Sequence, residues 1–250
     1  MKKWKIFVIN LAESKDRLGA CAQQLDDAGL DFERIEAVNG LSMSAETLSQ
    51  LYQFAESDYY KELSPGEIGC CLSHQQVWKK IIEDELDFAV VLEDDFVLQD
   101  SASDAIQTLA ELDTSWDIIK LGETPIKRRA IHQIPKNDFS LVTYNKVPAG
   151  TYAQAISAEG AKKLLAYDGF IQRPIDIDIQ YWWERDLKVF GLLPYSILVD
   201  RQKLSDIGKN SSQDDARSQA KKSFWKQLTS RLYFLFKNKK ERAKRLNQLD

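Results

Sequence analysis

Hydrophobic positions in this sequence form short apolar runs, separated by longer stretches with helical spacing. The run KIFVINL, residues 5–11, is rich in β-branched residues, which is typical of a strand buried on both faces. Apolar residues three or four positions apart, from Leu18 to Ala28, predict a helix that ends near Gly29. A second helix is predicted from Ser64-Pro65 to Ile82. Further strands are expected at 31–38, 87–93, 116–122, 140–147, 151–157, 189–194 and 195–200, and further helices at 158–167 and 175–188.

The alternation of these elements predicts an α/β fold with a mostly parallel sheet flanked by helices. Residues 202–220 are polar and rich in Ser, Gln and Asp, a composition typical of a linker. We therefore expect one folded domain at 1–207, a polar linker at 208–220 and a tail at 221–250.

Charge is distributed unevenly along the chain. Residues 221–245 contain ten Lys and Arg and a single acid, Glu241, which gives this segment a net charge of +9. Because the whole chain carries −4 and Asp250 adds one negative charge, residues 1–220 carry −12. An acidic body with a basic tail predicts an anionic partner for the tail, either a membrane surface or nucleic acid.

The cysteines and the apolar runs indicate in which cellular compartment the protein resides. Three cysteines, two of them adjacent at Cys70 and Cys71, do not form a disulfide framework and favour a reducing environment. The first residues resemble the start of a signal peptide, but the apolar stretch Ile6–Ile9 is too short for one. No run reaches the roughly 20 apolar residues of a membrane-spanning helix. We expect the chain to stay in the cytoplasm.

Three consecutive carboxylates, Glu93, Asp94 and Asp95, follow the strand predicted at 87–93. Ligands of open α/β sheets bind beyond the carboxyl ends of the strands, and Mg²⁺ or Mn²⁺ prefers carboxylate oxygens together with substrate phosphates. In an extended segment Glu93 and Asp95 point to one side and would bind the metal, whereas Asp94 could approach a sugar or a ribose. The alternative is a solvated acidic loop after a strand.

Other motifs accompany this acidic cluster in a fixed order. They are INLAESKDR, AVNG, LSPGEIGCCLSHQQVWKKI, AVVLEDD and RPIDIDIQYWWE. Together they resemble glycosyltransferase family 25, which includes bacterial lipooligosaccharide galactosyltransferases and procollagen galactosyltransferase domains, over about residues 4–207. The resemblance implies a GT-A type fold, a UDP-sugar donor, transfer with inversion at the anomeric carbon, and a Mn²⁺ or Mg²⁺ ion bound by the acidic triplet.

A carboxylate outside the triplet should take the proton from the acceptor hydroxyl. The resemblance favours Asp176 as this base, and Asp178 is the second choice. Both also lie near a predicted helix start, where a carboxylate can simply cap the helix or interact with its dipole.

The resemblance also implies a set of donor-binding residues. Arg17 could bind a phosphate, or it could pair with Asp16 or Asp26 on the helix surface. A lone His with apolar neighbours is more often structural, and a Ser in a polar stretch more often belongs to a linker. The predicted donor-binding residues are Asn10, Leu11, Arg17, Ala37, Val38, His74, Asp94 and Ser205. For the acceptor, Tyr181, Trp182 or Trp183 could stack on a sugar, with one of the two Trp side chains in the core.

The tail predicts a basic amphipathic helix. At about 100° per residue its large apolar side chains fall within an arc of about 120°, and most basic residues lie outside it. These apolar residues are Phe224, Trp225, Leu228, Leu232, Leu235 and Phe236. Such a helix is typical of an interfacial membrane anchor. The alternative is a helix docked on the acidic body, and nucleic acid is disfavoured because that body would repel it.

These features predict a metal-dependent glycosyltransferase that moves galactose from UDP-galactose to a core sugar of lipooligosaccharide or lipopolysaccharide. A β-1,4 linkage is expected because it is common among the bacterial relatives. We expect the enzyme to be peripheral on the inner face of a bacterial inner membrane, where the acceptor resides. The alternatives are a transferase for another UDP-hexose, a Mg²⁺-dependent phosphohydrolase and a non-catalytic membrane-associated protein.

Overall fold

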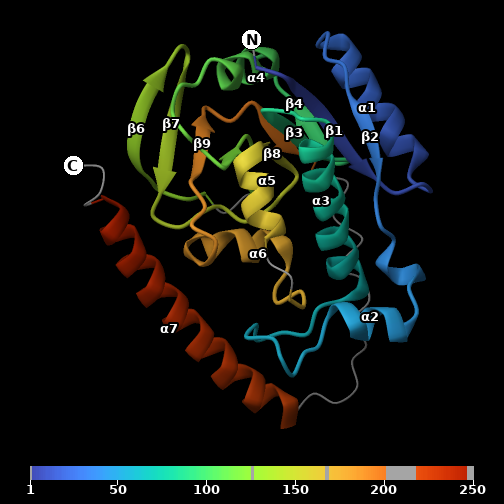
Figure 1. Ribbon diagram of the computed structural model, residues 1–250, viewed down its shortest axis with the longest axis vertical. Coiled ribbons are helices and arrows are strands. Elements are labelled where there is room, and N and C mark those ends of the chain that lie inside the picture. The colour runs from blue at the N-terminus through green and yellow to red at the C-terminus, as the bar shows by residue number, and fades with distance from the viewer. Residues whose placement is uncertain (1, 125–126, 167–168, 201–217, 247–250) are drawn as a thin grey trace.

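The computed structural model describes residues 2–124, 127–166, 169–200 and 218–246, with the backbone alone at 218–225 and 246. Its central feature is an eight-stranded sheet with the order β2-β1-β3-β8-β5-β9-β7-β6 (Figure 1). The strands of this sheet are β1 (Trp4–Asn10), β2 (Glu33–Glu36), β3 (Phe88–Glu93), β5 (Ile118–Lys120), β6 (Ala130–Lys136), β7 (Phe139–Tyr144), β8 (Ala153–Ser157) and β9 (Val189–Leu193). A separate antiparallel pair joins β4 (Phe96–Leu98) to β10 (Ile197–Val199).

Most strands of the large sheet run in the same direction. β1 is parallel to both β2 and β3, and β5 is parallel to β9. β8 lies antiparallel between β3 and β5, and β7 lies antiparallel between β9 and β6. Only β7 and β8 therefore oppose the other six strands of this sheet in the described residues. The predicted α/β fold with a mainly parallel sheet is confirmed.

Helices cover both faces of the sheet because β1 and β3 are apolar on both sides. Ile6 and Val8 pack on one face against α1 and α4, whereas Phe7 and Ile9 pack on the other face against α3, α5 and α6. The helices are α1 (Lys15–Asp27), α2 (Ala45–Leu51), α3 (Pro65–Glu83), α4 (Ala102–Ala110), α5 (Ala158–Leu165), α6 (Ile175–Gln180) and α7 (Ser218–Leu246). Short 3₁₀ turns lie at η1 (Gly40–Ser42) and η2 (Trp182–Glu184).

Several elements differ from the sequence expectation: α2, α4, β4 and β6 were not predicted, and one helix is shorter than expected. The helix expected at 175–188 ends at Gln180, because Tyr181 leaves the helical region with ψ of 38° and a 3₁₀ turn then places Trp182 in the core. Strand β6 was not predicted, since AIHQIPK is largely exposed and contains a proline. A sheet tolerates Pro135 there because β6 is an edge strand.

The expected C-terminal helix is present and lies along one side of the body (Figure 1). Among the described residues, no helix has the length and apolar content to cross a bilayer. The linker expected at 208–220 falls mostly outside the described residues, and the proposed domain boundaries stay a prediction.

Candidate active site

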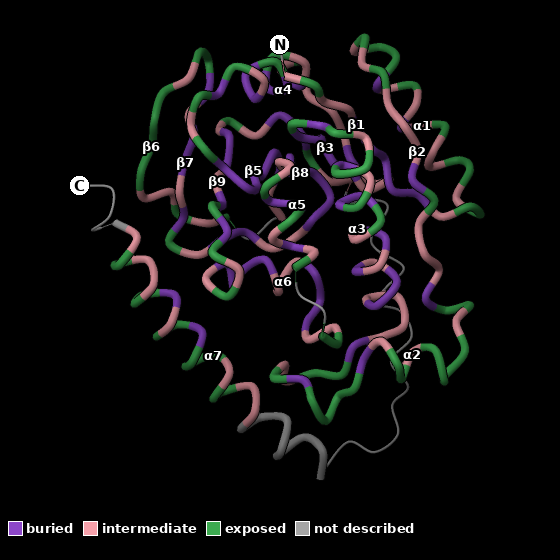
Figure 2. The backbone as a smooth tube through the Cα atoms, viewed as in Figure 1, coloured by how far each residue is buried: buried purple, intermediate pink, exposed green. Residues whose placement is uncertain are grey.

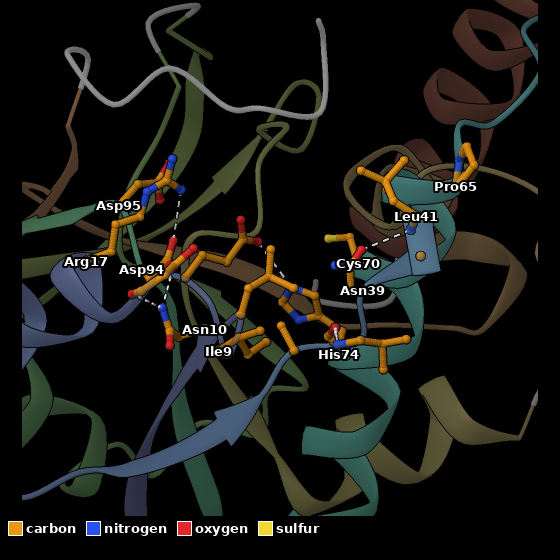
Figure 3. Close-up of a pocket in the computed structure, with 18 of the residues that line it drawn as sticks. Ile9, Asn10, Arg17, Asn39, Leu41, Pro65, Cys70, His74, Asp94 and Asp95 are labelled. Atoms are coloured by element: carbon orange, nitrogen blue, oxygen red, sulfur yellow. Dashed lines mark hydrogen bonds and ion pairs between the residues drawn. The ribbon is translucent and has the colours of Figure 1, made fainter. Parts of the chain in front are cut away.

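The acidic cluster forms the turn between β3 and β4, at the carboxyl end of a buried strand. Asp94 is held from two sides: Asn10 Nδ2 donates a hydrogen bond of 2.7 Å to Oδ2, and Arg17 NH1 lies 3.3 Å from Oδ1 (Figure 3). Arg17 therefore pairs with Asp94 across the cluster, whereas pairing with Asp16 or Asp26 was the alternative expected from the sequence. The buried Asn10 side chain serves mainly to fix Asp94 and the start of α1, because it also donates to the Ser14 carbonyl at 3.0 Å.

Glu93 turns toward α3 and β8. His74 Nε2 lies 3.1 Å from Oε1, and the Thr151 hydroxyl donates to the same oxygen. An ionised carboxylate only accepts hydrogen bonds, so Nε2 carries the proton of the His74 ring. Burial by itself would raise the pKa of Glu93, but the hydrogen bonds from His74 and Thr151 and the charge of Lys120 hold that pKa below its ordinary value. Glu93 is therefore ionised at neutral pH.

Asp95 is the least satisfied member of the cluster. Its Oδ1 is buried and has no hydrogen-bond partner among the described residues. Burial, Glu93 and Asp94 together raise the pKa of Asp95 to about 7. A divalent cation beside this oxygen would relieve both the missing contact and the repulsion between carboxylates. The residues present therefore fit a hard cation with oxygen ligands, which is the Mn²⁺ or Mg²⁺ expected from the sequence.

A second set of donor atoms lies beside this one. Ligand atoms of Cys70, His74 and Glu93 lie within 4.8 Å of one another. Burial and the charge of Glu93 raise the pKa of Cys70, so its sulfur stays a protonated thiol, which is a poor metal ligand. We therefore favour the oxygen ligands of the acidic cluster. The pairing of Glu93 with Asp95 on one ion stays a prediction, because Glu93 already accepts from His74 and Thr151.

A cavity of about 260 Å³ opens at this strand end (Figure 3). Its walls come from the end of β1, the loop that follows β2, the first turns of α3 and the acidic cluster. Every predicted donor-binding and metal-binding residue that the structure describes lines this cavity: Asn10, Leu11, Arg17, Ala37, Val38, His74, Glu93, Asp94 and Asp95. Ser205 lies outside the described residues. The fold thus gathers one sequence-predicted set at one place, and the role of each residue stays a prediction.

Two glycines let the wall of this cavity close tightly. A Cβ on Gly40 would lie 1.7 Å from the Pro65 carbonyl oxygen, and one on Gly69 would lie 2.4 Å from the Val38 carbonyl oxygen. The loop is also tied to α3 by a 2.8 Å hydrogen bond from the Val38 amide to the Ser73 hydroxyl. The Asn-Gly turn therefore positions the cavity wall, which a surface turn would not do.

The start of α3 is fixed by its own sequence. Ser64 Oγ accepts from the Glu67 amide at 3.3 Å, and Glu67 Oε2 accepts from the Ser64 amide at 2.7 Å. Pro65 occupies the first turn, where its missing N–H costs nothing. Glu67 therefore serves as a helix cap.

Asp176 lies at the start of α6, outside the residues that line the cavity. It accepts hydrogen bonds from the Gly150 amide at 3.3 Å and from the Ile177 amide at 2.8 Å. Burial raises its pKa, partly offset by these two amides and by the charge of Lys120. A carboxylate with a raised pKa, close enough to interact with the charge of Glu93, is suited to general-base chemistry.

Asp178 has a different environment. Its Oδ1 lies 3.2 Å from Arg173 NH1, and its Oδ2 lies 2.7 Å from Arg185 NH1. Both carboxylate oxygens are thus occupied by guanidinium groups, which compete with an acceptor hydroxyl for the same positions. The geometry favours Asp176 over Asp178, the order expected from the sequence.

The aromatic residues expected at the acceptor pack elsewhere. Trp183 and Tyr181 contact Phe234 of α7, with ring centroids 5.4 Å and 5.1 Å from it. Trp182 is buried and donates from Nε1 to Asn238 Oδ1 at 3.2 Å. One of the two Trp side chains was expected in the core without a choice between them, and Trp182 is the buried one. The stacking platform is therefore replaced by a docking site for α7.

The sequence did not predict the buried residues that hold Glu93 and Asp176 in position. Lys120 is fully buried in β5 and donates to the Gly150 carbonyl at 2.8 Å and to Gln154 Oε1 at 2.9 Å. The segment Gly150–Thr151 then donates to both Asp176 and Glu93. A single lysine inside the apolar run WDIIKLG was the available signal, because an uncompensated charge in a buried strand is costly.

Comparison with known proteins agrees with the motifs. The profile of glycosyltransferase family 25 (LPS biosynthesis protein) matches residues 3–179. Procollagen galactosyltransferase 2 of Mus musculus is 29% identical over 216 residues, covering 77% of this chain and 34% of that protein. The inactive glycosyltransferase 25 family member 3 of Mus musculus is 29% identical over 246 residues, covering 84% of this chain and 40% of that protein. The chain thus spans well under half the length of either relative.

Among solved structures, a glycosyltransferase involved in the glycosylation of the major capsid of PBCV-1 aligns with a TM-score of 0.45 and 9% identity, covering 90% of this chain and 99% of that one. The family profile covers more than two thirds of the sequence and includes the cavity and the acidic cluster. This chain belongs to glycosyltransferase family 25.

Proposed function

We propose that this chain is a metal-dependent, inverting glycosyltransferase that moves galactose from UDP-galactose to a core sugar of lipooligosaccharide or lipopolysaccharide. One observation carries the proposal: Asp95 presents a buried, partnerless oxygen beside an anchored Asp94, in a cavity at the carboxyl end of β3. A cation bound there would supply the missing contact and offset the repulsion between the carboxylates. Family membership and galactosyltransferase relatives support the reaction class.

Different residues around the cavity are expected to bind different parts of the donor. A Mn²⁺ or Mg²⁺ ion held by the acidic cluster would neutralise the charge that develops on the departing diphosphate. Arg17, paired with Asp94 at the cavity edge, is placed to interact with a phosphate of the nucleotide. The loop 37–40 and the first turn of α3 form an adjacent wall against which a base or ribose can lie.

Asp176 is the proposed base. Inversion requires the acceptor hydroxyl to attack the anomeric carbon from the face opposite the leaving group, while a carboxylate takes its proton. The raised pKa of Asp176 makes it a stronger base than an exposed aspartate. Gly150 holds one oxygen of this carboxylate in place through its amide.

The acceptor and the linkage are the most specific parts of the proposal. The family description refers to LPS biosynthesis, which supports a lipid-linked core sugar, and a β-1,4 linkage is our working assignment. Such an acceptor places the enzyme at the inner face of a bacterial inner membrane. Glucose or an N-acetylhexosamine is the alternative to galactose as the donor sugar.

A non-catalytic role is the competing function. It is favoured by one observation, the similarity to a relative described as inactive. It predicts no release of UDP from any UDP-sugar, and it predicts that substitution of Asp95 leaves the behaviour of the protein unchanged.

The test is UDP release from a panel of UDP-sugars with Mn²⁺ and candidate core-sugar acceptors. We expect UDP-galactose to be used by the wild type, and the rate to fall by about 100-fold or more in Asp95→Ala and in Asp176→Ala. Asp26→Ala, on the exposed face of α1, is the matched control and should retain full activity. Equal rates in all four proteins would refute the site, and no turnover of any donor would favour the non-catalytic role.

A further inference from the structure

α7 docks on the body through one face with a four-residue repeat. Lys226 Nζ donates to the Ser57 carbonyl at 3.1 Å, and Ser230 Oγ donates to the Asp58 carbonyl at 3.3 Å. One and two turns further along, Phe234 and Asn238 are buried against the body. The repeat of four residues places all these side chains on one side of the helix.

The C-terminal half of α7 is held by further polar contacts. Asn238 Nδ2 donates to the Asn145 carbonyl at 2.8 Å, and Arg245 NH1 donates to the Leu187 carbonyl at 2.7 Å. Arg245 NH2 also lies 2.7 Å from Asp186 Oδ1. The helix thus satisfies the alternative expected from the sequence, a tail docked on the acidic body, but the docked face carries polar side chains and Phe234 and lies outside the predicted apolar arc.

The apolar side of α7 points away from the body. Leu232, Leu235 and Phe236 are 57%, 60% and 67% exposed, and Leu228 is also exposed. At about 100° per residue, the centre of this arc lies about 150° from the centre of the docked face. Figure 2 shows α7 at the edge of the molecule, with exposed residues along its length. Docking therefore leaves the predicted apolar arc uncovered in the described part of the helix.

Basic side chains flank this arc. Arg231 lies on one side of it and Lys240 on the other, both exposed, and the exposed Lys239 lies within it. The single acid of the segment, Glu241, is already paired with Lys244 at 2.9 Å. An apolar stripe bordered by cations matches a bilayer whose surface is anionic, because the apolar side chains enter the acyl boundary while the cations remain at the headgroups. The cations Arg231 and Lys240 that flank the arc would repel those of a second copy of this helix.

We propose that the outward face of α7 binds the surface of an anionic lipid bilayer, while its inward face holds the enzyme body against that surface. Membrane contact and docking on the body, which the sequence left as alternatives, thus occur together on opposite sides of one helix. The purpose of this contact rests on the proposed function, since a lipid-linked acceptor lies at the bilayer. The contact itself requires no catalysis and can be measured separately.

The experiment is flotation of the full chain with vesicles of phosphatidylcholine alone or of phosphatidylcholine with phosphatidylglycerol. We expect binding to the anionic vesicles, little binding to the neutral ones, and weaker binding at high salt. The double variant Leu232→Asp/Phe236→Asp should bind about 100-fold more weakly, because two apolar side chains and the local charge are lost. Ile134→Asp/Leu198→Asp, at exposed apolar positions of the body, adds the same charge and should bind like the wild type.

Several results would overturn the proposal. They are no flotation of the wild type with anionic vesicles, equal flotation with neutral vesicles, or equal flotation of the α7 variant and the wild type. A wild-type dimer in light scattering that the α7 variant dissociates, without flotation, would show that a second copy covers the face. Release of UDP from UDP-galactose in the presence of a water-soluble acceptor, measured on the same preparations, reports on catalysis alone, so the two proposals can fail independently.

Discussion

Lys120 offers the sharpest test of how the site is supported. Its amine is fully buried beneath Glu93 and Asp176, and burial lowers its pKa from 10.5 to about 8, although the two nearby carboxylates favour the charged form. At 1.36 kcal/mol for each pH unit between these values, the buried charge costs about 3 kcal/mol of stability below pH 8. The change Lys120→Met removes that cost and leaves the Gly150 and Gln154 oxygens without a donor, which costs about 1–3 kcal/mol each.

The two effects oppose each other at pH 7, about 3 kcal/mol against about 2–6 kcal/mol, so the pH dependence of stability is the informative quantity. A lysine with a lowered pKa in the folded state contributes its full stability above the pKa of the unfolded chain, and that stability is lost as the pH falls through about 8. Between pH 7 and 9.5 the wild type should therefore gain about 2 kcal/mol relative to Lys120→Met. Activity should fall in the variant, because Gly150 and Thr151 would no longer be held beside Asp176 and Glu93.

The assay is denaturant unfolding of wild type and Lys120→Met at both pH values. The exposed Lys79→Met on α3 serves as the control and should show no pH-dependent difference from the wild type. A difference between wild type and Lys120→Met that stays constant within about 0.5 kcal/mol would mean that folding does not lower the pKa of Lys120, which would contradict the assigned effect of burial.

Three further predictions concern the cavity. Gly40→Ala should destabilise the fold by about 1–3 kcal/mol, because its Cβ would overlap the start of α3. Gly19→Ala has no atom within 4 Å of its new Cβ and should stabilise α1 by up to about 1 kcal/mol. Thermal unfolding measures both changes. The pKa of Asp95 is raised to about 7, so without metal its contribution to stability is present below about pH 4 and is lost as the pH rises through 7. Asp95→Asn should therefore flatten the plot of unfolding free energy against pH between these values. An unchanged slope would contradict the raised pKa of Asp95. Thr151→Val should slow UDP release about tenfold by removing a donor to Glu93, and Thr151→Ser should retain the rate.

Local pattern was sufficient for the elements that carry the cavity. The runs at β1 and β3 are apolar on both faces, so they could only be central strands, and Ser64, Pro65 and Glu67 determine the start of α3 through short-range hydrogen bonds. The carboxyl ends of neighbouring parallel strands must lie at the same edge of a sheet. The family resemblance had already placed Asn10 and the acidic cluster at one donor site, and the pairing of β1 with β3 brings them together.

The environment of each carboxylate required the tertiary structure. Glu93, Asp94 and Asp95 are three consecutive carboxylates, yet one faces His74, one is held by Arg17, and one has a buried Oδ1 without a hydrogen-bond partner in the described part of the chain. Those contacts join residues far apart in sequence, and a pKa depends on burial and neighbouring charge. Periodicity along the chain contains neither quantity.

The tail shows the same division. The spacing of Leu228, Leu232 and Leu235 determined that a helix would form with an apolar side, because that property depends only on the helical repeat. Which side would face the body was decided by the surface it meets, where backbone carbonyls at Ser57, Asp58 and Asn145 accept hydrogen bonds from its polar side chains. A sequence determines which faces an element can offer, but only the folded body determines which face is used, since the complementary donors and acceptors come from distant parts of the chain.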